Sequence, residues 1–283
     1  MMITNAGELL KTVNEMGFLP FFKNEVKGFS LEEMTPSEYW FREGVEGPWE
    51  WKDIIARSGE CIYAKLFNQR AGYVSLEWFP HLANYRRDGY DFDSLADEGF
   101  ADQRDRAVMQ ALERNGACLS KELRRICGFT GEKAKGFESC ITRLQMMTYI
   151  LPVSFELMTD RSGKEYGWGV ARYAVTEKRF GELARSEYKT DPEESFEKLM
   201  ARMRELNPKT DEKTLLKLIK RMKWRITLSI RLKKKRISGN LPPSVSIRKN
   251  AVLRARNVRL TAATIPALPS PSKRKITFVR LGE

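Results

Sequence analysis

The chain has very few residues of the kinds that bind transition metals. Its 283 residues include a single histidine, His81, and four cysteines. Cys61, Cys118, Cys127 and Cys140 lie far apart, and no Cys-x-x-Cys pair is present. A structural zinc site needs several such ligands at short spacings, and one histidine leaves triad chemistry little to work with. We therefore expect no metal and no cofactor, and reduced cysteines that pack inside a cytoplasmic protein.

The sequence also lacks a long apolar segment and the common catalytic motifs. No apolar run approaches the roughly 18 residues that a membrane-spanning helix needs, so we expect no membrane partner. The first segment, MMITNAGELLKTVNEMG, has neither the basic start nor the apolar stretch of a signal peptide. There is no P-loop, GxGxxG, HExxH, nucleophile elbow or EF-hand pattern. These absences exclude the enzyme classes that such motifs mark.

Acidic residues are almost absent from the C-terminal segment, residues 222–283. It holds 16 of the 50 Lys and Arg residues but only one of the 37 acids, Glu283. Residues 1–221 therefore have a net charge of −2, although the whole chain has +13. Two interpretations of this composition stay open. The segment is a flexible basic arm that binds phosphates without sequence preference, or a stretch not selected to fold, such as one created by a reading-frame change.

Residues 101–176 contain three helical segments followed by a hairpin. The first two segments end at Gly116 and Gly128, and Ser120 is the expected N-cap of the second. In the third, GEKAKGFESCITRLQMMTYI, apolar residues recur three and four positions apart, as on one face of a helix. The apolar period then changes to two in LPVSFELM, and a Gly-containing turn leads to a strand ending at Val175. This order is typical of the winged helix, a helix–turn–helix variant.

The region before it repeats this order more loosely. Helices are predicted in ELLKTVNEMG, SEYWFREG and PWEWKDIIARSG, and a second hairpin in ECIYAKLF and YVSLEWF. The stretch FPHLANYRRDGYDFDSLADEG is predicted to be a polar linker. We therefore expect an α+β fold of tandem winged-helix modules. The predicted domains are an N-terminal winged-helix-like module with linker (1–100), a winged-helix domain (101–176), C-terminal helices (177–221) and a basic, disordered tail (222–283).

The winged-helix prediction implies a way to bind double-stranded DNA. The third helix would enter the major groove, and the tip of the wing would contact phosphates or the minor groove. The predicted DNA-binding residues are Lys133, Lys135, Ser139, Thr142, Arg143 and Met146 on the helix, and Arg161 and Lys164 at the tip. An alternative stays open, because many winged helices are protein-interaction domains. In that case the helix packs on the other module, and the partner is another protein or a second copy of the chain.

The segment NYRRDGYDFD is a second candidate site. Arg86 and Arg87 are predicted to hold a phosphate, and Asp88, Asp91 or Asp93 to act as a general base or as an oxygen ligand of a hard cation. Asp-Gly-Tyr-Asp is also ordinary turn chemistry, in which carboxylates accept hydrogen bonds from nearby backbone N–H groups. The turn interpretation is favoured, because spacing alone does not build a cation site.

Aromatic residues gather in the N-terminal region. Trp49, Trp51 and the run Tyr39–Phe41 have the composition of a surface that stacks on an extruded base. Aromatic residues at such spacings are more often core residues, and we favour core packing for most of them.

Several stretches resemble the bacterial AlkZ-related proteins, distant relatives of the AlkZ/YcaQ winged-helix DNA glycosylases. They are GFLPFF, GPWEWKDIIARSG, NYRRDGYDFD, KGFESCITRLQMMTYI and KEYGWGVARYAV. The resemblance covers roughly Gly17 to Arg221 and stops where the basic tail begins. It implies tandem winged-helix modules, DNA as the partner and, by extension, removal of alkylated bases or repair of crosslinks.

The chain departs from the glycosylases at their catalytic motif. Those enzymes resemble one another in a Gln-x-Gln motif that positions and activates the hydrolytic water. The four glutamines here are Gln69, Gln103, Gln110 and Gln145, and no two are separated by one residue. The sequence therefore predicts a DNA-binding protein without assigned catalytic residues. An active DNA glycosylase that uses Asp88 or Asp91, and a protein-interaction scaffold, are the alternatives.

Overall fold

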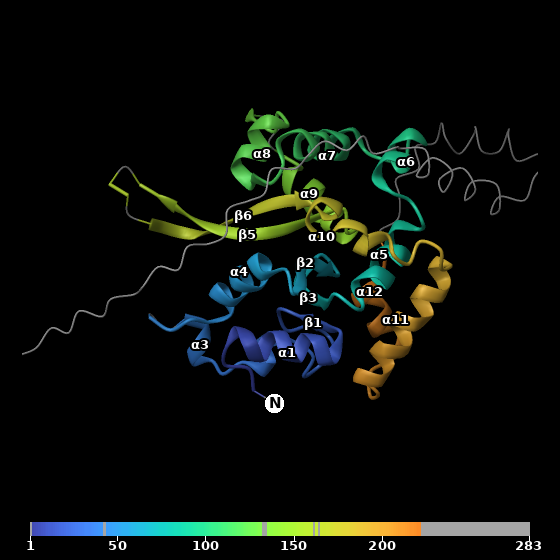
Figure 1. Ribbon diagram of the computed structural model, residues 1–283. Coiled ribbons are helices and arrows are strands. Elements are labelled where there is room, and N and C mark those ends of the chain that lie inside the picture. Colours follow the sequence, from blue (N-terminus) through green and yellow to red (C-terminus); the bar gives the residue numbers. More distant parts are fainter. Residues whose placement is uncertain (1, 42–43, 132–134, 161, 164, 222–283) are drawn as a thin grey trace, which may run out of the picture. The chain divides into compact units, whose positions relative to one another are not determined.

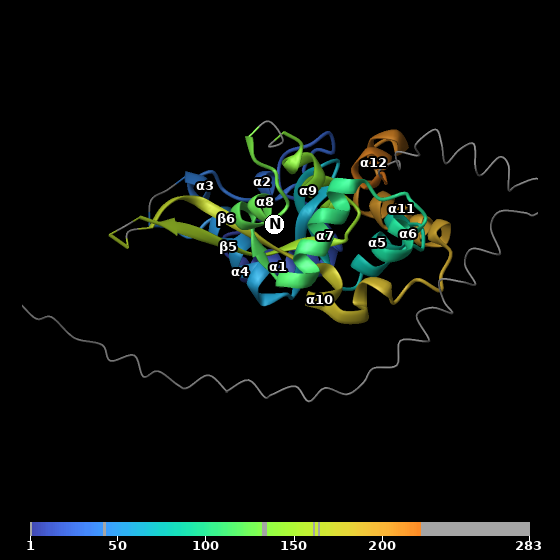
Figure 2. The same ribbon diagram turned by 90° about the horizontal axis from the view of Figure 1, so that it is seen from above.

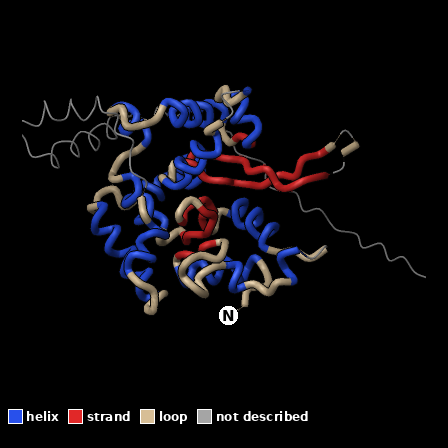
Figure 3. Tube along the Cα trace, turned by 180° about the vertical axis from the view of Figure 1, so that it is seen from behind, coloured by secondary structure: helices blue, strands red, loops and turns tan. Residues whose placement is uncertain are grey.

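The computed structural model describes residues 2–41, 44–131, 135–160, 162–163 and 165–221. The chain divides into two parts, Met1–Leu241 and Pro242–Glu283, and every described residue lies in the first. In that part, helices pack with two three-stranded antiparallel sheets, so the α+β class is confirmed. Figure 3 shows the strands in two separate groups with helices around them. The predicted tail lies outside the described residues.

The first sheet belongs to an N-terminal module, residues 6–75. Its elements are α1 (Ala6–Met16), β1 (Phe18–Pro20), α2 (Leu31–Met34), α3 (Glu38–Phe41), α4 (Pro48–Ser58), β2 (Cys61–Phe67) and β3 (Arg70–Ser75), and the strand order is β1-β3-β2. Gly17 ends α1 with a φ of 86°, and a Cβ there would lie 2.6 Å from the Trp78 ring. Asn68 and Gln69 turn the hairpin, both with positive φ as tight hairpin turns require.

The second sheet belongs to a central module, residues 103–175. Its elements are α7 (Gln103–Asn115), β4 (Cys118–Leu119), α8 (Ser120–Ile126), α9 (Phe137–Met146), β5 (Ile150–Thr159) and β6 (Glu165–Val175), and the strand order is β4-β6-β5. Both modules therefore run helix, strand, helices, strand, strand, with the last strand in the middle of the sheet. The N-cap of α8 is Leu119 rather than the predicted Ser120, because Glu122 accepts the Leu119 N–H (3.0 Å).

The predicted polar linker between the modules is wrong. It forms α5 (Phe79–Arg87) and α6 (Phe92–Asp97), and most of α5 is buried. The polar side chains of this buried helix use their donors within the molecule. Asn84, for example, donates to the Thr190 carbonyl (3.0 Å) and to the Ser195 hydroxyl (2.9 Å).

The remaining helices follow the central module and pack on α5. They are α10 (Thr176–Phe180), a 3-10 turn (Gly181–Arg185), α11 (Pro192–Leu206) and α12 (Glu212–Ile219). Asp191 and Asp211 are the N-caps of α11 and α12, since each side chain accepts a backbone N–H of the first turn. Leu199, Met200 and Met203 of α11 share a buried cluster with residues of β2 and α5. This cluster joins the C-terminal helices to the N-terminal module.

The aromatic residues of the N-terminal module are core residues, as favoured from the sequence. Phe21 lies within 5.5 Å of the ring centroids of Trp40 and Trp49, and Trp51 is fully buried. Phe41 is the exception, with 82% of its surface exposed. The rings therefore stabilise the module and do not form a stacking surface around Trp49 and Trp51.

The two modules pack on each other in a reciprocal way. Helix α9 of the central module contacts β2, and α4 of the N-terminal module contacts β5. The Lys65 backbone N–H donates to Gln145 Oε1 (3.0 Å), and the Phe155 backbone N–H donates to Asp53 Oδ1 (2.6 Å). In Figures 1 and 2, the β5–β6 hairpin passes beside α4. The last helix of each module is thus covered by the hairpin of the other.

Two buried arginines join α9 to the rest of the molecule at its C-terminal end. Arg86 Nη1 donates to the Met146 carbonyl (2.9 Å), and its Nη2 donates to the Leu66 carbonyl of β2. The last carbonyls of a helix have no partner within the helix and carry negative partial charge. A guanidinium group therefore suits this position. Burial lowers the pKa of Arg86, but a guanidinium group stays protonated in proteins.

Arg87 continues the same contact one residue further along. Its Nε donates to Thr148 Oγ1 (2.8 Å), and its other N–H groups donate to the Thr148 carbonyl, to Glu177 and to the Tyr188 hydroxyl (3.1 Å). Burial by itself lowers the pKa of Arg87, but the adjacent Tyr188 and Glu177 outweigh burial and raise it. Thr148 has a φ of 63°, a strained conformation for a β-branched residue. We call Arg86 and Arg87 the arginine clamp.

Arg87→Met is expected to lower the free energy of unfolding by about 3 kcal/mol, because it removes the buried cation that pairs with Glu177 and the donor to the Thr148 hydroxyl. Urea denaturation measures the change. Arg114→Met, on the exposed side of α7, is the matched control and is expected to change stability by less than about 0.5 kcal/mol. Equal effects of the two substitutions would contradict the clamp.

Candidate nucleic-acid interface

The C-terminal half of α9 faces protein rather than solvent. Thr142 Oγ1 accepts a hydrogen bond from Lys65 Nζ (3.2 Å). Arg143 forms a bidentate pair with Asp105 (2.7 and 2.6 Å), and that hydrogen bond raises the pKa of Arg143. Met146 is buried, so its predicted place on an outer, DNA-facing surface is wrong. Docking on β2 thus removes this half of the helix from a DNA surface.

The N-terminal end of α9 is open. Lys135, Glu138 and Ser139 are exposed, so two of the predicted DNA-binding residues reach solvent. The predicted contacts Lys133, Arg161 and Lys164 lie outside the described residues.

The predicted phosphate site at Arg86 and Arg87 does not fit the structure. The two residues are 1% and 0% exposed, and the arginine clamp uses their donors within the protein. Their positive charges serve to bind carbonyl groups at the end of a helix. The sequence alone does not distinguish a helix-end contact from a phosphate site, because both show a pair of basic residues beside a turn.

Asp88 and Asp91 serve the turn chemistry that the sequence favoured. Asp88 ends α5 in a left-handed conformation, φ 53°, and its carboxylate pairs with Arg221 (3.0 Å). Asp91 caps α6 by accepting the Ser94 N–H (2.7 Å). Among the described residues, no group of three His, Cys, Asp or Glu side chains is arranged to hold a metal ion.

Helix α8 presents basic side chains that the sequence analysis did not single out. Lys121, Arg124 and Arg125 are spaced three and four residues apart, so they share one face, and Lys121 and Arg125 are exposed. Like charges at this spacing repel weakly, although Arg124 and Arg125 gain from the negative end of the helix dipole. The spacing in KELRR was the signal in the sequence.

This face continues onto the ends of α7 and α9. Arg104 Nη1 donates to the Lys135 carbonyl (3.1 Å), and the Arg124 guanidinium lies 4.9 Å from the Phe137 ring centroid. Glu138 pairs with Arg124 (3.3 Å). The described cations here are Arg104, Lys121, Arg124, Arg125 and Lys135, and we call them the α8–α9 edge.

A second basic surface surrounds a pocket of about 610 Å³ at the base of the β5–β6 hairpin. Its lining residues come from α4, the segment before β4, both strands of the hairpin, and α10. They are Arg57, Ala117, Val153, Ser154, Glu156, Arg172, Ala174, Lys178 and Arg179. We call it the hairpin-base pocket.

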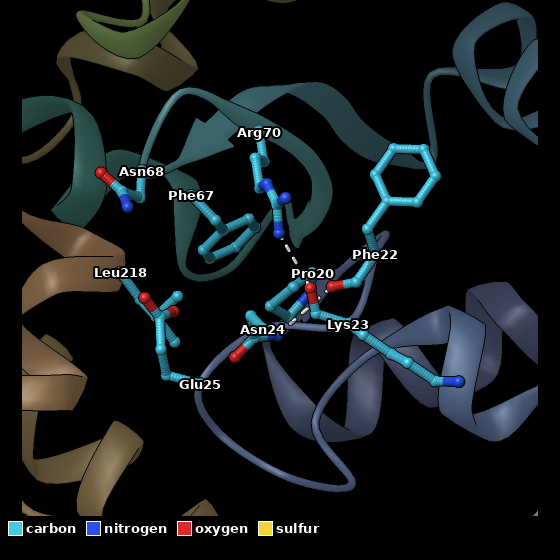
Figure 4. Close-up of a pocket in the computed structure, with 9 residues that line it drawn as sticks. All are labelled: Pro20, Phe22, Lys23, Asn24, Glu25, Phe67, Asn68, Arg70 and Leu218. Carbon is cyan, nitrogen blue, oxygen red and sulfur yellow. Dashed lines mark hydrogen bonds between the residues drawn. The ribbon is translucent and has the colours of Figure 1, made fainter.

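A third feature is a pocket of about 540 Å³ beside the β2–β3 turn. Figure 4 shows the Phe67 ring in its middle, with Asn68 and Leu218 on one side. Arg70 Nη1 donates to the Lys23 carbonyl (2.9 Å), which ties the turn to the loop after β1. The complete lining is Pro20, Phe22, Lys23, Asn24, Glu25, Phe67, Asn68, Arg70 and Leu218. We call it the turn pocket.

Comparison with known families now adds to the geometry. A family model described as AlkZ related matches residues 3–220, which is more than three quarters of the chain. The chain belongs to the AlkZ-related family. Searches among curated proteins and among solved structures found no match. In this AlkZ-related protein, no helix of the described residues has both the length and the apolarity for a membrane crossing.

The glutamines of this AlkZ-related protein have different roles. Gln145 is buried between α9 and β2, where it accepts the Lys65 N–H. Gln69 lies in the β2–β3 turn, and Gln103 and Gln110 are exposed on α7. Gln145 therefore holds the two modules together.

Gln145→Met is expected to lower the free energy of unfolding by about 1–2 kcal/mol, because it leaves the Lys65 N–H without its acceptor at a buried contact. Gln110→Met on the exposed side of α7 provides the control and is expected to leave stability within about 0.5 kcal/mol of wild type. Thermal and urea unfolding measure both. An unchanged stability of the Gln145 variant would show that this contact does not hold the modules.

Proposed function

We propose that this AlkZ-related protein binds double-stranded DNA through tandem winged-helix modules, with the α8–α9 edge on the DNA. Family membership supports DNA as the partner, and the repeated order of elements and strands supports the tandem architecture. The single observation that carries the proposal is the basic, exposed corner of the helix–turn–helix in the central module. Residues 1–221 as a whole have a net charge of −2, so DNA binding by this part of the chain needs a local basic surface.

The geometry of this corner matches how a helix–turn–helix docks. In such proteins the N-terminal residues of the recognition helix contact base edges, while the helix before it crosses the backbone. Here Lys135 and Ser139 at the start of α9 reach solvent, and Lys121 and Arg125 of α8 face outward beside them. The buried C-terminal half of α9 is thus compatible with DNA binding by its first turns.

The N-terminal module contributes no equivalent helix. Its last helix, α4, packs on β5, and Lys52 Nζ lies 4.8 Å from the Trp49 ring centroid and 4.5 Å from that of Phe155. Burial lowers the pKa of Lys52. This module therefore supports the central module and leaves the DNA contact to the α8–α9 edge.

Lys121→Ala and Arg125→Ala are each expected to weaken binding to a plain duplex and to make the dependence of log Kd on log salt less steep by about one, because each loses one phosphate contact. Fluorescence anisotropy of the full chain over a salt series measures both quantities. The basic tail is the same in every variant, so only differences from wild type are compared.

Lys213→Ala on α12 removes an exposed charge away from this edge and is the matched control. Equal slopes for all three variants would contradict the role of the α8–α9 edge. Absence of DNA binding at every salt concentration, together with stable self-association or a bound protein partner, would establish the scaffold alternative.

A second candidate function, hydrolysis of the N-glycosidic bond of a damaged base, is favoured by the turn pocket. Its lining combines the half-buried Phe22 ring with the exposed Asn68 amide, and an aromatic ring and an amide are groups that stack on a base and hydrogen-bond its edge. Glu25 is the one carboxylate among its lining residues. Asp88 and Asp91 are not among them, so the proposed water-activating residue moves to Glu25.

Release of free base from a methylated duplex tests this candidate. Glu25→Gln is expected to lower the release rate at least about 100-fold, the usual contribution of a general base. Asp88→Asn and Asp91→Asn keep the turn geometry and are expected to release base at the wild-type rate. No release by the wild-type protein from any lesion would rule out the glycosylase, and would leave the DNA-binding proposal untouched.

A further inference from the structure

We propose that the hairpin-base pocket is a phosphate-binding site, separate from the α8–α9 edge, and that it takes a phosphodiester of the bound DNA. The inference rests on the proposed DNA binding for the source of the phosphate. The affinity of the site for phosphate depends on the residues of the pocket alone.

The pocket collects like charges from distant parts of the sequence. Arg57 ends α4, Arg172 lies on β6, and Lys178 and Arg179 lie on α10. Three guanidinium groups and an ammonium group thus line one pocket together with a single carboxylate, Glu156. Guanidinium groups bind phosphate oxygens in a bidentate way, and a Ser154 hydroxyl adds a donor.

The one carboxylate in the lining is already paired with a cation, so it does not repel a bound anion. Glu156 receives both Nε and Nη2 of Arg172 (2.7 and 3.1 Å), and this hydrogen bonding lowers the pKa of Glu156 and raises that of Arg172. Arg172 Nη1 also donates to the Ala117 carbonyl (2.9 Å). The pair is therefore a fixed wall of the pocket, and Arg172 is held in place.

The other cations are partly engaged and exposed. Arg57 pairs with Asp53 (2.8 Å) and Lys178 with Glu113 (3.2 Å), and the two side chains are 53% and 63% exposed. Exposed pairs of this kind contribute about 0–1 kcal/mol, so a phosphate can compete for them. They give the pocket charge that can be redirected to a ligand.

Arg179 is the strongest candidate contact. Its Nη2 donates to the Arg57 carbonyl at the end of α4 (2.6 Å). Within the described part of the chain, no carboxylate forms an ion pair with Arg179, so its charge is uncompensated. An arginine has five N–H donors, and one hydrogen bond leaves the others for an anion. The contact with α4 holds the side chain at the pocket.

The pocket is also connected to the proposed DNA surface. Arg172 lies 3.9 Å from Glu122 in the first turn of α8, and Ser154 faces Arg172 across the hairpin. A backbone that crosses α8 can therefore continue to the base of the hairpin. Two separated phosphate contacts would fix the direction of the duplex on the protein.

Arg179→Gln tests the site, because glutamine removes the charge and keeps a polar, hydrogen-bonding side chain. With the full chain and a plain duplex, Arg179→Gln is expected to make the salt dependence of log Kd less steep by about one, and Lys178→Gln with Arg179→Gln by about two. At 0.1 M salt, each lost contact corresponds to an affinity loss of up to about eightfold. A purely structural role of Arg179 would not change the slope.

Lys11→Gln, an exposed lysine on α1, is the matched control. If the pocket variants bind with the wild-type slope while Arg125→Ala does not, the pocket inference is wrong and the proposed function stands. If the wild-type protein binds no DNA, thermal unfolding with added inorganic pyrophosphate tests whether the pocket binds phosphate. A saturable rise in Tm that Arg179→Gln abolishes supports a site for free phosphate compounds, and no rise overturns the inference.

Discussion

The arginine clamp is the contact on which the arrangement of the modules depends. The C-terminal carbonyls of α9 end inside the protein, where water cannot satisfy them, and Arg86 and Arg87 supply the donors. The same guanidinium groups bind Leu66 of β2 and Glu177 of α10. One helix, α5, thereby ties the end of α9 to the N-terminal module and to the C-terminal helices.

This constraint decides which surfaces remain available. With α9 held against β2, and α4 against β5, the faces that third helices use to read DNA are covered over much of their length. What remains exposed is the edge formed by α8 and the first turns of α9, and the pocket at the base of the hairpin. Both are basic, in a body whose net charge is close to zero. Local placement of charge, rather than its total, therefore governs the proposed DNA contact.

Membership of the AlkZ-related family and the absence of the Gln-x-Gln motif concern two different properties, DNA binding and hydrolysis. The family supports DNA as the partner. Gln145 is used for packing between the modules, and Asp88 and Asp91 serve at a helix end and as a cap. We therefore assign hydrolysis, as a proposal, to other groups, and the turn pocket offers Glu25 together with an aromatic ring and an amide. DNA binding and hydrolysis are thus separate proposals for this molecule.

By itself, the sequence determined the local structure: the order of helices and hairpins in both modules, the caps at Asp191 and Asp211, and the turn chemistry of Asp88 and Asp91. These depend on residues a few positions apart, which is the range over which period and capping act. Only the tertiary structure decided that Arg86 and Arg87 are buried and that the second half of α9 is covered. The same basic residues suit a phosphate or a helix end, and the choice depends on contacts between residues about 60 positions apart.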